Sequence, residues 1–260
     1  MNLALIGYGK MGKMIEQIAR ALKHNITVIV DPFAADAPAG IKINKTIAEA
    51  EFNSVDAAIE FTQPDTAIKN IIDLAERKIP VVTGTTGWHD RMSEAVKAVE
   101  KADSSLLWAS NFSIGVNMFY RIAWYAAELA NNFCEYDAGG FESHHNKKMD
   151  SPSGTAKVLA EGVLSRLDRK NKIVWETMNR KPAADELHFP SLRMGSVPGT
   201  HSLFFDSSAD TIEITHIARS REGFASGAVR AASWLTEKKR RGVFTIDDMM
   251  KDLFKNQELL

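Results

Sequence analysis

Short apolar runs alternate with longer amphipathic segments along the first hundred residues, and this alternation restricts the possible folds more than any other feature. Strands are expected at residues 3–6, 26–30, 57–61, 80–82 and 105–108, and helices at residues 11–22, 64–75 and 90–99. Strands that alternate with helices in this way form a parallel sheet covered on both faces. The sequence therefore predicts an α/β fold with a doubly wound parallel sheet.

The regular alternation of short apolar runs and amphipathic segments ends after about residue 112. We expect a long helix at residues 116–133, a polar and basic loop at 143–148, a helix after Ser153, and strands at 201–205 and 212–217. Helices return at residues 225–235 and 246–254. This order predicts a first domain formed by residues 1–112 plus about 225–260, with an inserted α+β domain at residues 113–224.

A glycine loop, residues 7–12, follows the first strand and opens the first helix. It has the pattern G-x-G-x-x-G, in which Gly7 permits the turn, Gly9 lets the backbone approach a pyrophosphate and Gly12 lets helix and strand pack closely. Asp31 lies 19 residues after Gly12, at the end of the second strand, where a carboxylate accepts hydrogen bonds from a ribose. This order predicts a Rossmann-type domain that binds NAD or NADP.

A second motif combines two imidazoles and two ammonium groups with a helix start. His144, His145, Lys147 and Lys148 precede a segment of small residues at 153–155. The N-terminus of a helix binds anions through its N–H groups and its dipole. Histidine exchanges a proton near neutral pH, and lysine can protonate a carbanion. The motif thus predicts an anion site beside proton donors.

Two other interpretations of the basic motif remain open from the residues alone. A solvent-exposed basic loop before a serine-capped helix needs no function. A metal site from His144, His145 and Asp150 is disfavoured because adjacent histidines rarely converge on one ion, and we expect no metal. His188, His201 and His216 are expected to be hydrogen-bonded or core histidines. The cationic run at residues 238–241 is expected to be a solvated helix end.

Composition excludes several classes of protein. The 260 residues include 32 Lys and Arg against 33 Asp and Glu, a formal charge of −1 that disfavours a dedicated nucleic-acid binder. Cys134 is the single cysteine, so no intrachain disulfide can form. No apolar run approaches the ~20 residues of a membrane helix, and the N-terminus lacks a signal-peptide pattern. We expect a cytoplasmic protein with neither nucleic-acid nor membrane partners.

Together these motifs resemble the dihydrodipicolinate reductase family, also called 4-hydroxy-tetrahydrodipicolinate reductases, of bacterial lysine and diaminopimelate biosynthesis. The segment from His144 to Ala156 is similar to the family's signature, with Ser151 in place of an alanine. Further similar segments follow in the family's order at residues 60–64, 84–87, 109–117, 213–216 and 227–230. Two departures are a glycine loop one residue shorter and Pro32, where some members have an arginine.

The resemblance implies a reaction, a substrate and an assembly. The reaction is the NAD(P)H-dependent reduction of 4-hydroxy-tetrahydrodipicolinate, via dihydrodipicolinate, to tetrahydrodipicolinate. His144 and Lys148 would transfer protons, and His145, Gly154 and Thr155 would bind the dicarboxylate. The inserted domain would bind substrate and form a homotetramer through its sheet, and residues 109–117 would be a hinge. The cofactor would be bound by Gly7, Gly9, Lys10, Met11, Gly12, Asp31, Gly84, Thr85, Thr86, Ala109, Ser110, Asn111 and Phe112.

Cofactor choice and rival functions complete the predictions. Asp31 accepts from ribose hydroxyls and repels a 2′-phosphate, so NADH is expected to be preferred or equal, with Lys10 and Lys42 as cations that favour NADPH. Another two-domain NAD(P) oxidoreductase is a rival, but such enzymes lack the paired histidines before the helix start. A non-catalytic NAD sensor is a second rival, and the presence of both His144 and Lys148 speaks against it.

Overall fold

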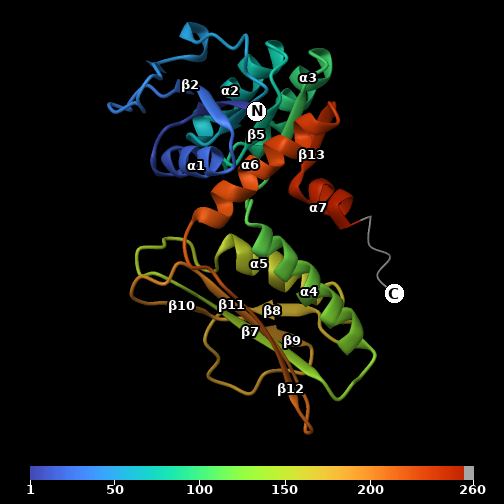
Figure 1. The fold of residues 1–260 in the computed structure, drawn as a ribbon. Coiled ribbons are helices and arrows are strands. Elements are labelled where there is room, and N and C mark those ends of the chain that lie inside the picture. The colour runs from blue at the N-terminus through green and yellow to red at the C-terminus, as the bar shows by residue number, and fades with distance from the viewer. Residues whose placement is uncertain (255–260) are drawn as a thin grey trace. The chain divides into compact units, whose positions relative to one another are not determined.

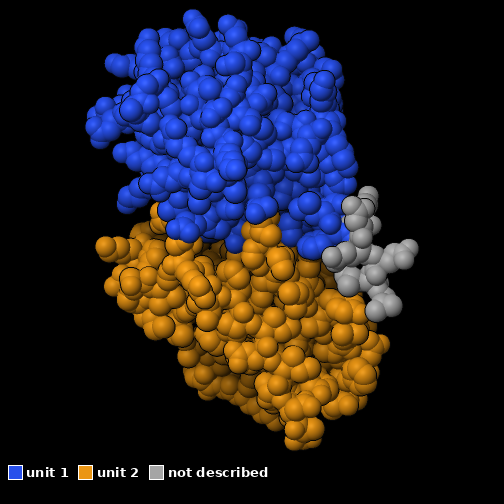
Figure 2. Space-filling model, in the orientation of Figure 1, with its two compact units in different colours: residues 1–113, 222–260 blue, residues 114–221 orange. Residues whose placement is uncertain are grey.

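A computed structural model of the chain describes residues 1–254, which divide into two compact units (Figures 1 and 2). Unit 1 comprises residues 1–113 and the chain from 222 onward, and unit 2 comprises residues 114–221. The second unit is therefore an insertion into the first, between residues 113 and 222. Among residues 1–254, no helix combines the length and the apolarity needed to span a bilayer.

Unit 1 is built on a seven-stranded sheet whose paired strands are all parallel. Its order is β3-β2-β1-β4-β5-β6-β13, which is the doubly wound order predicted from the alternation of apolar runs. The strands are β1 (Asn2–Ile6), β2 (Asn25–Val30), β3 (Ile43–Asn44), β4 (Ala57–Glu60), β5 (Val81–Thr83), β6 (Ser105–Trp108) and β13 (Gly242–Thr245). The helices are α1 (Lys10–Ala21), α2 (Pro64–Glu76), α3 (Met92–Lys101), α6 (Glu222–Glu237) and α7 (Ile246–Phe254).

Helices bury both faces of this sheet. Every residue of β4 and β5 is buried, which requires cover on both sides because successive side chains point to opposite faces. Helix α1 packs against α6, and α2 packs against α3. The strand order reverses between β1 and β4, so the loops after these strands diverge and leave a crevice at the carboxyl edge. That edge carries the glycine loop.

Unit 2 is a mixed sheet covered by two helices (Figure 1). Strands β7, β11 and β12 are antiparallel neighbours, whereas β9 and β10 each pair with β7 in parallel. The strands are β7 (Asp137–His144), β8 (Lys172–Val174), β9 (Glu186–His188), β10 (Ser191–Arg193), β11 (Thr200–Asp206) and β12 (Thr211–Ile217). The helices are α4 (Ile114–Asn131) and α5 (Gly154–Leu164), whose apolar sides pack with β7 and β11 in one core. The predicted α+β class of the inserted segment is thus confirmed.

Two local expectations are wrong. The polar segment that starts at Ser143 is not wholly a loop, because β7 continues through His144. Arg240, expected at a solvated helix end, packs its guanidinium 3.8 Å from the centre of the Trp234 ring and forms an ion pair with Asp252 at 2.5 Å. Its aliphatic stem and charge are therefore part of the contact between α6 and α7.

Candidate active site

Three glycines of the loop after β1 differ in the space around them. A Cβ on Gly7 would lie 2.1 Å from the carbonyl oxygen of Phe61, and Gly7 has a φ of +93°. A Cβ on Gly12 would lie 2.3 Å from the Gly7 carbonyl oxygen, whereas no atom lies within 4 Å of the Cβ position of Gly9. Gly7 and Gly12 therefore serve the turn and the packing of α1, and Gly9 faces open space where a ligand can approach.

The start of α1 suits an anion. Its N-cap residue, Gly9, supplies no side-chain hydrogen bond, and the first turn contains no acidic residue. The first N–H groups of a helix point along its axis and carry the positive end of its dipole. The residues present thus fit the pyrophosphate of a dinucleotide.

Asp31 joins two loops at this edge. One carboxylate oxygen accepts the Tyr8 N–H at 2.6 Å, and the other accepts the N–H groups of Phe33 and Ala34 at 2.7 and 2.9 Å. A carboxylate has about four acceptor positions, so one remains for a ribose hydroxyl. Asp31 therefore shapes the glycine loop as well as facing the groove.

A groove in unit 1 contains part of the predicted cofactor set. Gly7, Gly9 and Asp31 line it together with Lys45 and Lys69. Lys42, considered above as a cation for NADPH, instead lines a separate hollow beside Glu49 and Glu51. The cations that share a groove with Asp31 are thus ones that the sequence did not indicate.

The remaining predicted cofactor residues lie in the loops after β5 and β6 and in the first turn of α1. Gly84 approaches Phe61 so closely that a Cβ would lie 2.2 Å from the ring, and the Thr85 hydroxyl accepts the Thr62 N–H at 2.8 Å. Phe112 is 1% exposed, with its ring centre 6.2 Å from that of Phe61, so it supports the loop from the core. The others of this set are Lys10, Met11, Thr86, Ala109, Ser110 and Asn111; Lys10, Thr86 and Ser110 are exposed, Met11 and Asn111 half-buried, and Ala109 buried.

Glu60 is a buried carboxyl at the end of β4. It accepts hydrogen bonds from the hydroxyls of Thr62 and Thr83, and Thr85 and Asn70 also contribute. Burial raises the pKa of Glu60 above its usual value, while these hydrogen bonds oppose the shift. The carboxyl thus ties together the loops after β4 and β5.

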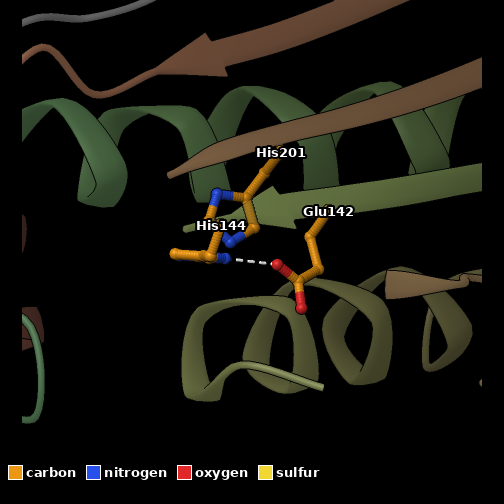
Figure 3. Close-up of side chains that lie close together, drawn as sticks. All are labelled: Glu142, His144 and His201. Carbon is orange, nitrogen blue, oxygen red and sulfur yellow. Dashed lines mark hydrogen bonds and ion pairs between the residues drawn. The ribbon is translucent and has the colours of Figure 1, made fainter. Parts of the chain in front are cut away.

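In unit 2, strand register gathers a second group of polar residues on the helix-covered face of the sheet. Glu142 and His144 are two residues apart on β7, so their side chains share that face. On β11, His201 lies directly opposite Glu142, and on β10, Arg193 pairs with His144. Figure 3 shows Glu142, His144 and His201 pointing toward one another.

The carboxylate of Glu142, 0% exposed, is the centre of this group. One oxygen is hydrogen-bonded to His144 Nδ1, and the other accepts Arg193 Nη2 at 2.8 Å and the Ser153 N–H at 3.2 Å. Burial acts to raise the pKa of Glu142, but the hydrogen bonds from His144 and Arg193 outweigh it and hold the pKa at about 2. Glu142 is therefore an anion at neutral pH.

His201 is a buried neutral base beside this anion. Burial, followed by the nearby charge of His144, lowers the pKa of His201 to about 3. Its Nε2 lies 3.2 Å from Ser153 Oγ, and its Nδ1 has no hydrogen-bond partner among residues 1–254. The ring stands edge-on to His144, with 5.2 Å between ring centres.

The predicted anion-binding helix start is present. Ser153 is the N-cap of α5 and accepts the Ala156 N–H at 3.1 Å. No acidic residue lies in the first turn of α5, and open space surrounds the Cβ position of Gly154. Thr155, half-buried, follows in the same turn, so this end of the helix can accept an anionic group.

The basic loop joins the same network through a chain of contacts. Lys148 Nζ forms an ion pair with Asp150 at 2.8 Å, and Arg193 Nη2 donates to both the Asp150 carbonyl and Glu142. His145, half-buried, has a buried Nδ1 without a partner among residues 1–254. The structure thus connects the two expected proton donors, His144 and Lys148, through three intervening residues.

Ligand-type atoms of Glu142, His144 and His201 lie within 4.8 Å of one another, close enough for one metal ion. Glu142 is, however, already neutralised by Arg193 and hydrogen-bonded to His144. We therefore interpret the group as a hydrogen-bond network.

Glu142 and Arg193 had no role in the sequence analysis, and His201 was expected only as a hydrogen-bonded or core histidine, which the structure confirms. A signal for Glu142 was present, because Glu-x-His on a strand places both side chains on one face. It was missed because the segment was interpreted as a loop. Arg193 and His201 are brought to β7 by pairing of strands far apart in sequence, and no local pattern marks them.

Two family models match successive parts of the chain. Residues 1–112 match the family described as "Dihydrodipicolinate reductase, N-terminus", and residues 115–250 match "Dihydrodipicolinate reductase, C-terminus". A 4-hydroxy-tetrahydrodipicolinate reductase of Christiangramia forsetii is 40% identical, with 98% of this chain and 100% of that protein covered. One of Archaeoglobus fulgidus is 36% identical, with 96% and 100% covered.

A solved structure shows the same fold at lower sequence similarity. It is a dipicolinate-bound dihydrodipicolinate reductase from Paenisporosarcina sp. TG-14, with a TM-score of 0.76, 18% identity, and 94% of this chain and 97% of that chain covered. The predicted reduction in lysine and diaminopimelate biosynthesis, by a nicotinamide-dependent oxidoreductase, is confirmed by the named relatives. On this evidence, the chain belongs to the 4-hydroxy-tetrahydrodipicolinate reductase family.

Proposed function

We propose that His144 and Lys148 are the proton donors in the reduction of 4-hydroxy-tetrahydrodipicolinate, with the start of α5 as the site for a substrate carboxylate. The observation that carries the proposal is the network on β7, in which one buried carboxylate contacts both His144 and the N-cap residue of α5. A proton donor and an anion site are thereby held beside each other within unit 2.

The substrate site follows from the charge of the ligand. The substrate has two carboxylates, and α5 offers N–H groups at Gly154 and Thr155, with His145 and Lys148 in the preceding loop. The related structure from Paenisporosarcina is described as bound to dipicolinate, which is also a dicarboxylate. Binding at a helix end fixes the ring, and orientation of this kind can supply several kcal/mol.

The protons are supplied by this chain's own residues. A bound nicotinamide supplies the hydride, which adds to C4 of the ring after loss of water and leaves an enamine-like anion. His144 holds a proton on the nitrogen that faces away from Glu142, and Lys148 carries a second acidic proton on Nζ. We infer that one of these two groups protonates the anion.

We further infer that NADH is preferred or equal to NADPH, because Asp31 faces the groove as an acceptor. The residues assigned to the cofactor remain those of the glycine loop and the loops after β2, β5 and β6. We propose that the protein is located in the cytoplasm, because its family acts in biosynthesis with a nicotinamide cofactor.

We propose a homotetramer built through the open face of the unit 2 sheet. The rings of Phe141 and Phe204 stack there, with centres 6.1 Å apart, and Ile217 is 65% exposed. On this face, Phe204 of β11 is half-buried and Thr215 and Ile217 of β12 are exposed, so apolar groups are available for contact between subunits. Sedimentation of the protein should give the tetramer mass, and Phe204→Glu should give a smaller species.

Two experiments test the activity and the site. Purified protein with freshly made 4-hydroxy-tetrahydrodipicolinate should oxidise NADH, and the absence of oxidation with either cofactor would contradict the function. A crystal soaked with pyridine-2,6-dicarboxylate should show a carboxylate at the N–H groups of Gly154 and Thr155. Ligand bound elsewhere, with only water at this helix end, would refute the anion site.

A further inference from the structure

We propose that Glu142 is a positioning residue, which fixes the ring of His144 and the start of α5 through one carboxylate. The proposal rests on the function proposed above, because it concerns the partner of a residue assigned there as a proton donor. Glu142 is itself fully buried and has all its contacts with protein groups, so its role is to hold other residues in place.

The two carboxylate oxygens of Glu142 have different hydrogen-bond partners, and this supports the role. Oε2 is hydrogen-bonded to His144 Nδ1, whereas Oε1 accepts from Arg193 and from the Ser153 N–H. A shift of the carboxylate toward either side therefore breaks a contact on the other. The histidine and the helix start are held in a fixed relation by one rigid group.

The contact with Oε2 determines which nitrogen of His144 exchanges protons. An ionised carboxylate can only accept, so Nδ1 must carry a hydrogen in both charge states of the ring. The exchangeable proton is then on Nε2, which lies 2.9 Å from the position that a Cβ on Gly199 would occupy. The absence of a side chain at Gly199 leaves room beside this nitrogen.

The contacts of Oε1 govern the helix start. Ser153 donates its N–H to Glu142, accepts the Ala156 N–H with its hydroxyl, and contacts His201 with the same hydroxyl. The N-cap residue is thus fixed from three directions. A fixed N-cap orients the next N–H groups, which belong to Gly154 and Thr155.

Charged and polar side chains of several elements lie around His144. Glu142 on its own strand is the anion in contact, Arg193 on β10 lies on the far side of that carboxylate, and His201 on β11 is neutral. In the following loop, Lys148 is paired with Asp150. Because Arg193 neutralises Glu142, the buried carboxylate can hold the ring of His144 with less repulsion toward a dicarboxylate.

The first measurement needs no turnover. Nitrogen-15 NMR of histidine side chains in the unaltered protein should show His144 as the Nδ1–H tautomer at high pH, with His144→Asn used to assign its signals. The Glu142→Gln variant should also populate the Nε2–H tautomer, since an amide can donate to Nδ1 whereas a carboxylate can only accept from it. An Nε2–H tautomer in the unaltered protein would overturn the proposal even if the variant does not fold.

The second measurement is kinetic and has a matched control. Glu186 is also a buried glutamate of unit 2 with an arginine partner, Arg180 at 2.7 Å, and the hydrogen bond from Arg180 holds its pKa at about 2. Glu142→Gln should lower kcat about 10-fold or more, because the ring of His144 and the start of α5 lose their common anchor. Glu186→Gln should leave kcat unchanged. Equal kcat values for the two variants would overturn the proposal.

A double-variant cycle separates positioning from general destabilisation. If Glu142 acts through His144, then Glu142→Gln should change kcat less than 2-fold in the His144→Asn background, because coupled residues are not additive. Additive losses in kcat would contradict the inference. An unaltered protein without reductase activity would contradict the proposed function instead, while the NMR result would still decide the role of Glu142.

Discussion

Each compact unit buries one glutamate near the carboxyl end of a central strand, and the two units stabilise it in opposite ways. Glu60, at the end of β4, is surrounded by hydroxyl and amide donors, and burial raises its pKa. Glu142, near the end of β7, contacts an arginine and a histidine that hold its pKa at about 2 despite burial. The first accepts hydrogen bonds from neutral groups, and the second forms an ion pair with an arginine.

This difference between the partners of Glu60 and Glu142 fits the function proposed for each unit. At the cofactor edge, the neutral partners of Glu60 connect the loops that carry Thr62 and Thr85 without fixing a charge on them. In unit 2, proton transfer requires a histidine held in one orientation, and the buried carboxylate of Glu142 accepts from its Nδ1. A buried glutamate therefore connects two loops in one unit and orients a histidine in the other.

The largest expected effect removes the proton donors. His144→Ala and Lys148→Ala should each lower kcat about 10²-fold or more, the usual scale for a positioned acid. The affinity for NADH, measured by fluorescence titration, should stay within about 2-fold, because the predicted cofactor residues lie in unit 1. Unaltered kcat in both variants would show that the proton comes from another group.

The second effect is the loss in free energy of unfolding when each of the two glutamates is replaced by glutamine. Glu142→Gln leaves Arg193 without its buried anion and should reduce the free energy of unfolding by about 3 kcal/mol. Glu60→Gln replaces a group held by neutral hydroxyls, which can reorient toward an amide, so the loss should be about 1 kcal/mol or less. Urea unfolding of both variants at neutral pH checks the order, and equal losses would remove the contrast between the units.

The sequence predicts the cofactor edge of unit 1 better than the Glu142 network of unit 2, for a physical reason. Parallel strands that follow each other in sequence place their loops at one edge, so the glycine loop and Asp31 could be assigned from local patterns. The network in unit 2 depends on β10 and β11 pairing with β7, contacts between residues about 50 positions apart in the chain such as Arg193 and Glu142. Such pairing is set by tertiary packing, which no local motif encodes.

The third effect is that the contributions of Glu60 and Glu142 to stability change in opposite directions with pH. Burial raises the pKa of Glu60, so its contribution to stability is present below the unfolded value of 4.5 and is lost as pH rises through the folded value. The lowered pKa of Glu142 does the reverse: its contribution is present above 4.5 and is lost as pH falls toward about 2. Each slope is at most about 1.4 kcal/mol per pH unit for one proton.

Thermal unfolding at several pH values tests whether the two stability contributions have opposite pH dependences. Relative to the unaltered protein, Glu60→Gln should gain stability as pH rises above 4.5, and Glu142→Gln should regain it as pH falls below 4.5. Parallel curves for both variants would mean that the two carboxyls titrate alike.

The smallest expected effect concerns cofactor choice in unit 1. NADH should give the higher kcat/KM, or equality within ~10-fold, because one such contact is worth about 1.4 kcal/mol. Asp31 also holds the glycine loop through the Tyr8 N–H, so Asp31→Ala should weaken both cofactors while shifting the balance toward NADPH. Lys45→Ala is the sharper variant, because Lys45 lines the groove with Asp31 and its cation would stabilise a 2′-phosphate, which NADPH has and NADH lacks. It should lower kcat/KM for NADPH several-fold and leave NADH unchanged, with Lys42→Ala, in the separate hollow, as the matched control. A strong NADPH preference in the unaltered protein at low ionic strength would mean that Lys45 and Lys69 outweigh Asp31.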